Sequence, residues 1–293
     1  MKSTHYRPSS LSDPNSLIIA PYPFVGTEAN TGARCKYIAE KTGMVVLGYT
    51  RFGAGRTKIF DLSIRKALKP PTKSSNGRYA SLRPLEDTSA ALQDEAQNFE
   101  QIIGLGDSTG GIEAKALTVM GFPFTKLLLR DATNLKSPQP PVIGQGNYFA
   151  YQLLQERKKA SDENSYVCRE GLEPPDTQPV STPVRTMAAM TISEVFNYGP
   201  LWRSEWDKDN MRTIAAEYPR LPVMHIGLEH SFTATLQQSE AFVQELTTLR
   251  SSAGPDKAPL DAFVEYGMYH SDLEHPDITV KHLRRALIME DAL

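Results

Sequence analysis

The sequence predicts an α/β protein with a mostly parallel central sheet, helices on both faces of that sheet and an inserted helical cap. Three observations predict this class. Short apolar runs at residues 17–20, 44–49 and 102–105 alternate with helical stretches. Strands that alternate with helices of this length imply crossover connections and a parallel sheet. The alternation stops after Asn134 and resumes at Val223, so we interpret the segment between them as an insertion.

The elements of the first half can be justified in order. The apolar run at residues 17–20 is closed by Pro21, as when a strand enters a loop. A helical stretch over residues 29–41 ends at Gly43, the usual position of a C-terminal cap. Residues 44–49 are continuously apolar, as in a buried parallel strand. The remaining elements expected here are a helix at 87–101, a strand at 102–105, a helix at 110–120 and a strand at 127–129.

The segment from residue 135 to about 218 contains no run typical of a strand. It has helical patches at residues 148–159 and 192–218, the second rich in aromatic residues that include Trp206. Residues 161–182 can alternatively be a long disordered loop. We therefore expect residues 1–134 to form the first part of a core, 135–218 a helical cap and 219–293 the second part of the core. The elements expected in this last part are strands at 223–226 and 262–266 and helices at 236–250 and 276–290, with Pro276 at the first helical position.

Composition excludes several classes of partner. The 293 residues are 40% hydrophobic and 23% charged, as in ordinary soluble proteins. The net charge is only -2, so no global field favours nucleic acid or an anionic membrane. The basic stretch at residues 58–83 is interpreted as a surface loop, and Cys35 and Cys168 cannot build a disulfide framework. The N-terminus lacks the apolar core of a signal peptide, and no apolar run approaches a membrane span, so we expect a cytoplasmic protein.

One motif indicates a catalytic nucleophile. Residues 106–111 read Gly-Asp-Ser-Thr-Gly-Gly and match G-x-S-x-G between an apolar strand and a helix. Glycines on both sides allow a sharp, strained turn that exposes the hydroxyl of Ser108. The N-terminus of the following helix offers N–H groups and positive potential to an oxyanion. The alternative is a glycine-rich turn in which the serine has no function.

The sequence from residue 17 to the C-terminus resembles the α/β-hydrolase family, with the cap covered least. Residues 50–57 are similar to the family's D-x-R-G-x-G-x-S loop, and residues 105–111 to its G-x-S-x-G-G elbow. Residues 222–232 are similar to its seventh strand and the loop after it. Residues 267–270 are similar to the Gly-x-x-His that carries the catalytic base. The order serine, acid, histidine along the chain is the one that this fold requires.

The resemblance implies that His270 is the catalytic base. It follows the last expected strand, in a loop before the last helix. His275 is a competitor, but it adjoins Pro276 and is interpreted as a surface or capping residue. His225 alternates within a strand and is expected to be a packed core histidine.

The catalytic acid is where the sequence departs from the family. The position of the usual aspartate is occupied by His230, which cannot supply the required negative charge. Asp131 follows the expected sixth strand of the family, where some members keep their acid, and it is the preferred candidate. Glu229 is the alternative acid. Asp131 can instead be a structural loop residue, because relatives with a normal acid often carry one there.

The resemblance also implies an oxyanion hole. The N–H of Thr109, directly after the nucleophile, is one expected donor. The second comes from the loop after the first expected strand, where prolines alternate and have no N–H to give. Tyr22 is therefore the preferred second donor, and Phe24 is the alternative.

These residues predict a serine hydrolase that cleaves a small, mostly apolar ester-like substrate through an acyl-enzyme. No cofactor or metal is expected, and the expected partner is a small-molecule substrate. The same triad can serve a lactonase, a C–C hydrolase or an acyltransferase. A non-catalytic ligand-binding protein on the same scaffold is the alternative from a different class.

The resemblance implies an N-terminally truncated sheet. The family has two strands before the one at residue 17, and we expect the 16 residues that precede it here to be too few for both. The apolar strand at residues 44–49 would then be an edge strand with unpaired N–H and C=O groups. We expect the N-terminal arm, residues 62–82 or a second subunit to cover it, and the last of these predicts a homo-oligomer.

Overall fold

The computed structural model describes most of the expected core and small parts of the expected cap. The described residues are 2–21, 28–50, 83–135, 154–156, 158, 176–177, 204–231, 233–254 and 256–289. No helix in these residues has the length and apolar character that a membrane span requires. The expected basic loop at residues 58–83 lies almost entirely outside them.

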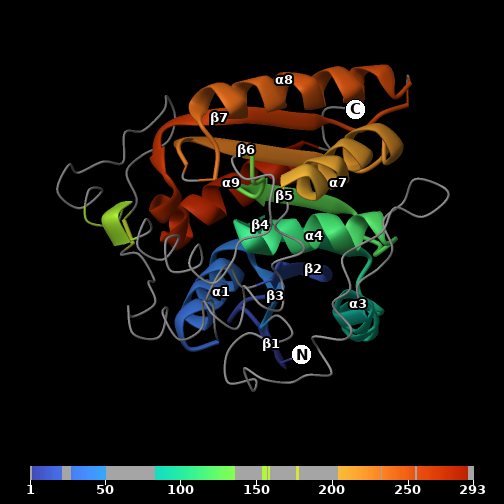
Figure 1. Cartoon of the computed structure of the whole chain (residues 1–293). Coiled ribbons are helices and arrows are strands. Elements are labelled where there is room, and N and C mark those ends of the chain that lie inside the picture. Colours follow the sequence, from blue (N-terminus) through green and yellow to red (C-terminus); the bar gives the residue numbers. More distant parts are fainter. Residues whose placement is uncertain are drawn as a thin grey trace.

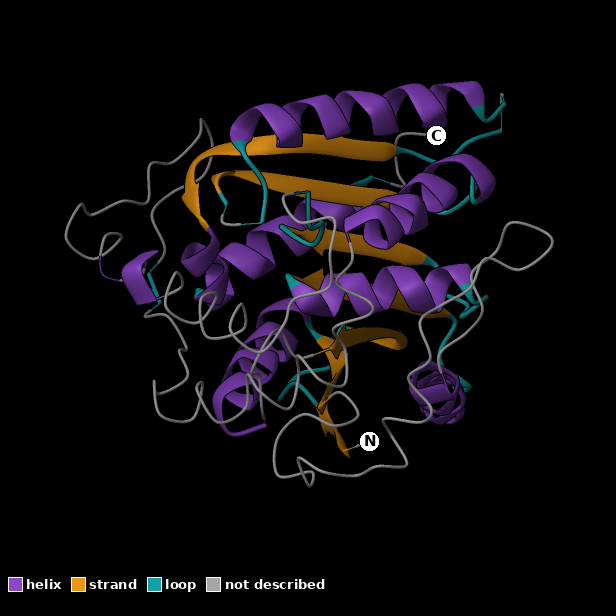
Figure 2. Cartoon of the chain, viewed as in Figure 1, coloured by secondary structure: helices purple, strands orange, loops and turns teal. Residues whose placement is uncertain are grey.

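Seven strands of the described residues form one sheet. It lies at the centre of the molecule (Figures 1 and 2). The strands are β1 (Lys2–Tyr6), β2 (Asp13–Pro21), β3 (Met44–Thr50), β4 (Gln101–Asp107), β5 (Lys126–Arg130), β6 (Val223–His230) and β7 (Leu260–Tyr269). Their order in the sheet is β1-β3-β2-β4-β5-β6-β7. Only the pairing of β1 with β3 is antiparallel among these strands. The mostly parallel sheet predicted from the sequence is confirmed.

Helices cover both faces of the sheet, as predicted. They are α1 (Glu28–Thr42), α3 (Arg83–Ala96), α4 (Thr109–Val119), α7 (Ser204–Glu217), α8 (Leu236–Ser252) and α9 (Pro276–Ile288), with a short 3-10 helix, η2 (His270–Glu274), before α9. Helices α1 and α9 pack on one face of the sheet, and α3, α4, α7 and α8 pack on the other. The carboxyl ends of the parallel strands therefore meet at one edge between two helical layers.

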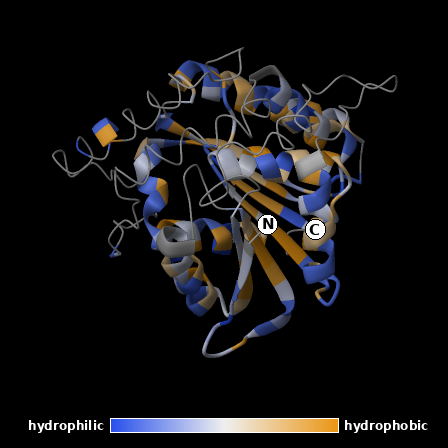
Figure 3. Ribbon diagram, turned by 60° about the horizontal axis from the view of Figure 1, so that its bottom comes forward, coloured by the Kyte–Doolittle hydropathy of each residue, from blue (hydrophilic) through white to orange (hydrophobic). Residues whose placement is uncertain are grey.

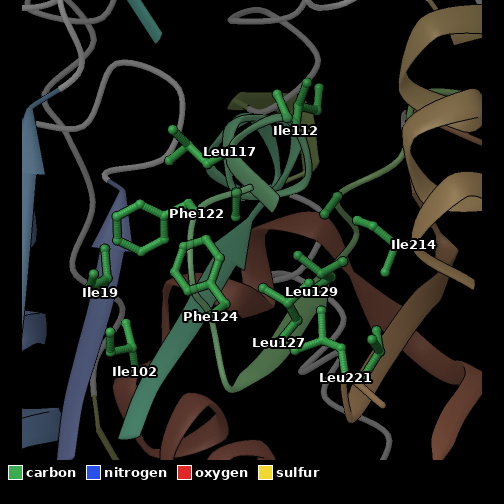
Figure 4. Packing of buried hydrophobic residues seen from close by; sticks show 14 of the residues in the cluster. Ile19, Ile102, Ile112, Leu117, Phe122, Phe124, Leu127, Leu129, Ile214 and Leu221 are labelled. Atoms are coloured by element: carbon green, nitrogen blue, oxygen red, sulfur yellow. The ribbon is translucent and has the colours of Figure 1, made fainter. Parts of the chain in front are cut away.

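Successive residues of each buried strand supply the two hydrophobic cores. In β2, Leu17 belongs to the core under α3, α4, α7 and α8, whereas Ile18 belongs to the core under α1 and α9. Figure 3 shows the apolar strands running through the middle of the molecule. In the first core, the rings of Phe122 and Phe124 lie with their centroids 4.6 Å apart (Figure 4). Burial of each such side chain contributes about 1.5–3 kcal/mol to the stability of the fold. The sheet is therefore a rigid support for the residues that follow the carboxyl ends of its strands.

The N-terminal arm corrects one expectation. Residues 2–6 form β1, which pairs with residues 46–50 of β3, so this part of β3 is paired on both sides and β3 is not an edge strand. The expectation that the strand at residues 44–49 lies at the edge of the sheet was therefore wrong, although the N-terminal arm was one of the three coverings expected for it. A homo-oligomer formed through that edge loses its basis, because β1 already occupies the hydrogen-bonding groups there.

Helix α7 falls within the range expected for the cap, yet it packs against α4 and α8. Its residues Trp206, Met211 and Ile214 are buried in the same core as the sheet. Trp206 therefore packs in the core, and the aromatic residues expected to line a cap at 196–202 lie outside the described residues. The boundaries of the cap remain a prediction.

Candidate active site

Ser108 lies in the turn between β4 and α4, where the sequence predicts a nucleophile. Its backbone has φ 51° and ψ -128°, a conformation that L residues rarely adopt. Such a backbone costs about 1–3 kcal/mol and persists only when the surroundings hold it in place. The side chain is largely buried, and the residue is 6% exposed.

The glycines of the motif are required by close packing at this turn. A Cβ on Gly106 would lie 2.3 Å from Cα of Gly111, and one on Gly111 would lie 2.2 Å from Cβ of Ala132. A Cβ on Gly110 would lie 2.7 Å from the carbonyl oxygen of Pro21. Helix α4 therefore begins in direct contact with the ends of β2, β4 and β5, which keeps the turn short and sharp.

Asp131 and His270 are in contact. Oδ2 of Asp131 lies 2.5 Å from Nδ1 of His270, and both side chains are buried. The hydroxyls of Ser231 and Thr233 donate to the same carboxylate, at 2.8 Å and 3.2 Å. A carboxylate against Nδ1 favours the tautomer in which Nδ1–H is the donor and Nε2 the proton acceptor, which is the form of a general base.

Ser108 shares the carboxyl edge of the sheet with this pair. The N–H of Ser108 donates to the carbonyl of Arg130 at 3.0 Å, and Asp131 is the next residue of that strand end. Asp131 itself donates its N–H to the carbonyl of Ile226 at 2.7 Å. His270 directly follows β7, which pairs with β6. The three residues predicted as nucleophile, acid and base therefore follow the carboxyl ends of β4, β5 and β7, at one edge of the sheet.

The environment of His270 favours its charged form. Burial alone disfavours the imidazolium, but the hydrogen bond and charge of Asp131, with the charges of Glu156 and Glu274, outweigh burial and raise the pKa of His270. A raised pKa makes the imidazole a stronger base for a hydroxyl proton.

Glu156 is a second carboxyl group at the site, and sequence reasoning missed it. Burial raises its pKa to about 7, partly opposed by the charge of His270. Its Oε2 is buried and has no hydrogen-bond partner among the described residues. Nothing in the sequence marks this residue, since it lies in a helical patch that is more than 100 positions from His270 in the chain.

Glu229, the alternative acid, has a different contact. Its carboxylate accepts the N–H of Gly267 at 2.8 Å, three residues before His270. Gly267 has φ 75°, a left-handed conformation that favours glycine. His230 stacks on the ring of Tyr269, with centroids 4.4 Å apart. Glu229 and His230 therefore support the segment that leads to His270.

The loop after Asp131 is fixed from α4 and α7. Nζ of Lys115 donates to the carbonyl of Ala132 at 2.7 Å and to the hydroxyl of Thr133 at 2.9 Å. The same Nζ lies 2.5 Å from Oδ1 of Asp207, and both side chains are fully buried. The second carboxylate oxygen of Asp207 accepts the N–H of Asn134 at 2.8 Å. These contacts hold the loop that follows Asp131 in place.

The other predicted site residues have different outcomes. Thr109 is the first residue of α4, next to Ser108. Tyr22 and Phe24 lie outside the described residues. His225 is buried, and burial lowers its pKa to about 3, as expected for a neutral core histidine. No group of His, Cys, Asp and Glu within the described ranges is arranged to hold a metal ion.

Comparisons with known proteins give fold relatives at low identity. No protein-family model and no curated relative matches the sequence. A hydrolase from Pseudomonas aeruginosa PA01 matches with a TM-score of 0.55 and 16% identity, over 97% of this chain and 93% of that chain. Proline iminopeptidase from Mycobacterium smegmatis matches with a TM-score of 0.54 and 17% identity, over 99% of this chain and 94% of that chain. Est1E from Butyrivibrio proteoclasticus, solved with ferulic acid bound, matches with a TM-score of 0.53 and 14% identity, over 100% and 96%.

Proposed function

The chain has the α/β-hydrolase fold, and from this premise we propose that it is a serine hydrolase acting on a small, mostly apolar ester-like substrate. The observation that carries the proposal is the 2.5 Å contact between Asp131 and His270, at the strand edge where Ser108 has its strained backbone. A strained serine at the same strand edge as a buried acid–histidine pair supports nucleophilic catalysis by Ser108.

In the proposed first step, Nε2 of His270 takes the proton of the Ser108 hydroxyl as Oγ attacks the ester carbonyl. The N–H of Thr109 and that of Tyr22, or of Phe24, stabilise the oxyanion of the tetrahedral intermediate. His270 then gives its proton to the leaving alcohol, and Ser108 remains acylated. Asp131 stays ionised throughout and stabilises the imidazolium.

The second step releases the acid. Water, deprotonated by His270, attacks the acyl-enzyme, and the returning proton restores the Ser108 hydroxyl. Every proton in this cycle is carried by His270, so the proposal needs no cofactor. Glu156 adds one polar group to the neighbourhood of the base, so we expect the substrate to present a polar group as well as an apolar body.

The proposal is tested with short p-nitrophenyl esters and a fluorophosphonate label. We expect Ser108→Ala to abolish both turnover and labelling while the protein stays folded. Ser252→Ala, at the exposed C-terminal end of α8, is the matched control and keeps both activities. Unchanged turnover in Ser108→Ala would remove Ser108 from the mechanism, and a wild-type protein that never labels would indicate a binding protein instead.

A further inference from the structure

Two non-glycine residues have a positive φ in the described part of the chain, and they are Ser108 (51°) and Asp131 (43°). Each directly follows one member of a buried ion pair. Ser108 follows Asp107, the last residue of β4, and Asp131 follows Arg130, the last residue of β5. The two strained residues are therefore attached to the two halves of one side-chain contact.

The contact between Asp107 and Arg130 is bidentate. Nε of Arg130 donates to Oδ1 at 2.7 Å, and Nη2 donates to Oδ2 at 2.8 Å. Arg34 of α1 also donates to Oδ2, and the hydroxyl of Thr279 in α9 accepts from both guanidinium groups, at 2.9 Å and 2.7 Å. Arg130 is fully buried and Asp107 is 5% exposed. Bidentate pairs of this kind fix geometry as well as charge.

The network ends on β7 with its charges balanced. Nδ1 of His282 lies 3.3 Å from Nη1 of Arg130, and its Nε2 lies 2.9 Å from the carboxylate of Glu265. Burial and the nearby Arg130 lower the pKa of His282, so a neutral ring accepts from Arg130 and donates to Glu265. Arg34 and Arg130 then balance Asp107 and Glu265. Buried charges that are paired in this way are costly to separate, because a lone buried charge is strongly destabilising.

We propose that Asp107 and Arg130 are positioning residues, whose buried pair fixes the backbone from which Ser108 and Asp131 project. The two residues are direct neighbours across β4 and β5, and the N–H of Ser108 also donates to the carbonyl of Arg130. A side-chain contact and a backbone hydrogen bond thus join the same two strand ends. Because a strained backbone persists only where it is over-determined, removing the side-chain contact releases both catalytic residues.

The first test compares Asp107→Asn and Arg130→Met with Arg250→Met. Arg250 is also a buried arginine, but it binds the carbonyls of Tyr218 and Pro219, at the other end of β6 from the site. We expect kcat for a p-nitrophenyl ester to fall about 100-fold in the first two variants, with KM little changed, because small misplacements of catalytic groups have effects of this size. Arg250→Met loses stability but keeps kcat when assayed well below its melting temperature.

The second test needs no substrate and separates this inference from the proposed function on which it rests. The pKa of His270 is measured by NMR titration of histidine-labelled protein, with the other groups that influence it, Glu156 and Glu274, unchanged. We expect the raised pKa of His270 to fall toward its ordinary value in Asp107→Asn, because Asp131 is no longer held against the ring. A chain without esterase activity still gives this result, so failure of the two proposals is distinguishable.

Thr279→Val provides a milder variant if the charge variants do not fold. It removes the hydroxyl that accepts from Arg34 and Arg130 and keeps the volume of the side chain. We expect a smaller change in the same direction, in kcat and in the pKa of His270. An unchanged pKa and unchanged kcat in folded Asp107→Asn, or equal losses of kcat in Arg250→Met, would overturn the inference.

Discussion

Oδ2 of Asp131 lies 2.5 Å from Nδ1 of His270, and two hydroxyls from the loop after β6 donate to the same carboxylate. In the family that the sequence resembles, that loop usually carries the acid, and here its hydroxyls contact the proposed acid, Asp131, which directly follows β5. The arrangement makes the roles of Asp131 and Glu229 separable by substitution.

We expect Asp131→Asn to lower turnover on the order of 10⁴-fold, by analogy with the serine-protease triad, because an amide cannot stabilise the imidazolium. Glu229→Gln is the matched control, since its amide oxygen can still accept the N–H of Gly267. Steady-state kcat on a p-nitrophenyl ester measures both. A large loss in Glu229→Gln with almost none in Asp131→Asn would assign the acid to Glu229.

The pH dependence of kcat/KM is expected to report His270. Activity needs the neutral imidazole, so the rate rises with pH through the raised pKa of His270. The ionised carboxylate of Glu156 contributes to that raised value, so Glu156→Gln shifts the rising limb to lower pH. Glu240→Gln, on α8 and hydrogen-bonded to the exposed Tyr266, is the control and leaves the limb in place. If the rising part of the pH profile stays at the same pH in Glu156→Gln, the carboxylate of Glu156 does not contribute to the pKa of His270.

Asp272 is expected to limit stability at neutral pH. Burial raises its pKa to about 6, above its ordinary value of 3.8, so the folded protein binds this proton more tightly than the unfolded chain. The protonated carboxyl of Asp272 therefore stabilises the folded state below about pH 4, and this stabilisation is lost as pH rises through about 6. Asp272→Asn keeps an acceptor for the N–H of Tyr269 and removes the penalty.

We expect Asp272→Asn to raise the free energy of unfolding at pH 7 by on the order of 1–3 kcal/mol, and to have little effect at pH 4. Urea denaturation at the two pH values measures the difference. An equal effect at both would show that the carboxylate charge is not the cause.

Much of the fold could be predicted from this sequence, because continuous apolar runs have few alternatives to buried strands. The run at residues 44–49 is observed as β3, and the run at 17–20 as the buried part of β2. β1 was missed because Lys2–Tyr6 is short and polar, and its pairing with β3 depends on partners that lie 40 to 48 positions away in the chain.

The site was predictable in part, for a related reason. Ser108 and His270 lie in local motifs that a single sequence displays, and Asp131 was one of two candidates. The contacts that orient them, from Ser231 to Asp131 and from Arg130 to Asp107, join residues that are 100 and 23 positions apart. Periodicity assigns charged residues such as Arg130 to the surface, so a fully buried arginine is invisible to it.

Gly111 is expected to be intolerant of a side chain. A Cβ there would lie 2.2 Å from Cβ of Ala132 and 2.9 Å from the carbonyl oxygen of Gly106, so the backbone must shift. Overpacking of this kind costs about 1–3 kcal/mol, and the shift moves α4 away from the acid loop. Gly227→Ala is the control, since a Cβ there would lie 3.3 Å from its nearest neighbour, Cβ of Ser239. Thermal melting and kcat check both variants, and wild-type values for Gly111→Ala would contradict this account.

The N-terminal arm is expected to keep the protein from associating. Deleting residues 1–10 removes β1 and leaves the N–H and C=O groups along one side of β3 without partners. The residues of β3 are almost all buried, so the exposed strand is apolar as well as unpaired. We expect light scattering to show dimers or larger species for the truncated chain. The double variant Ser3→Ala, His5→Ala is the control, because it removes the side-chain contacts with Glu95 and keeps the backbone pairing. If the double variant associates as the deletion does, those side-chain contacts and not the strand pairing protect the edge.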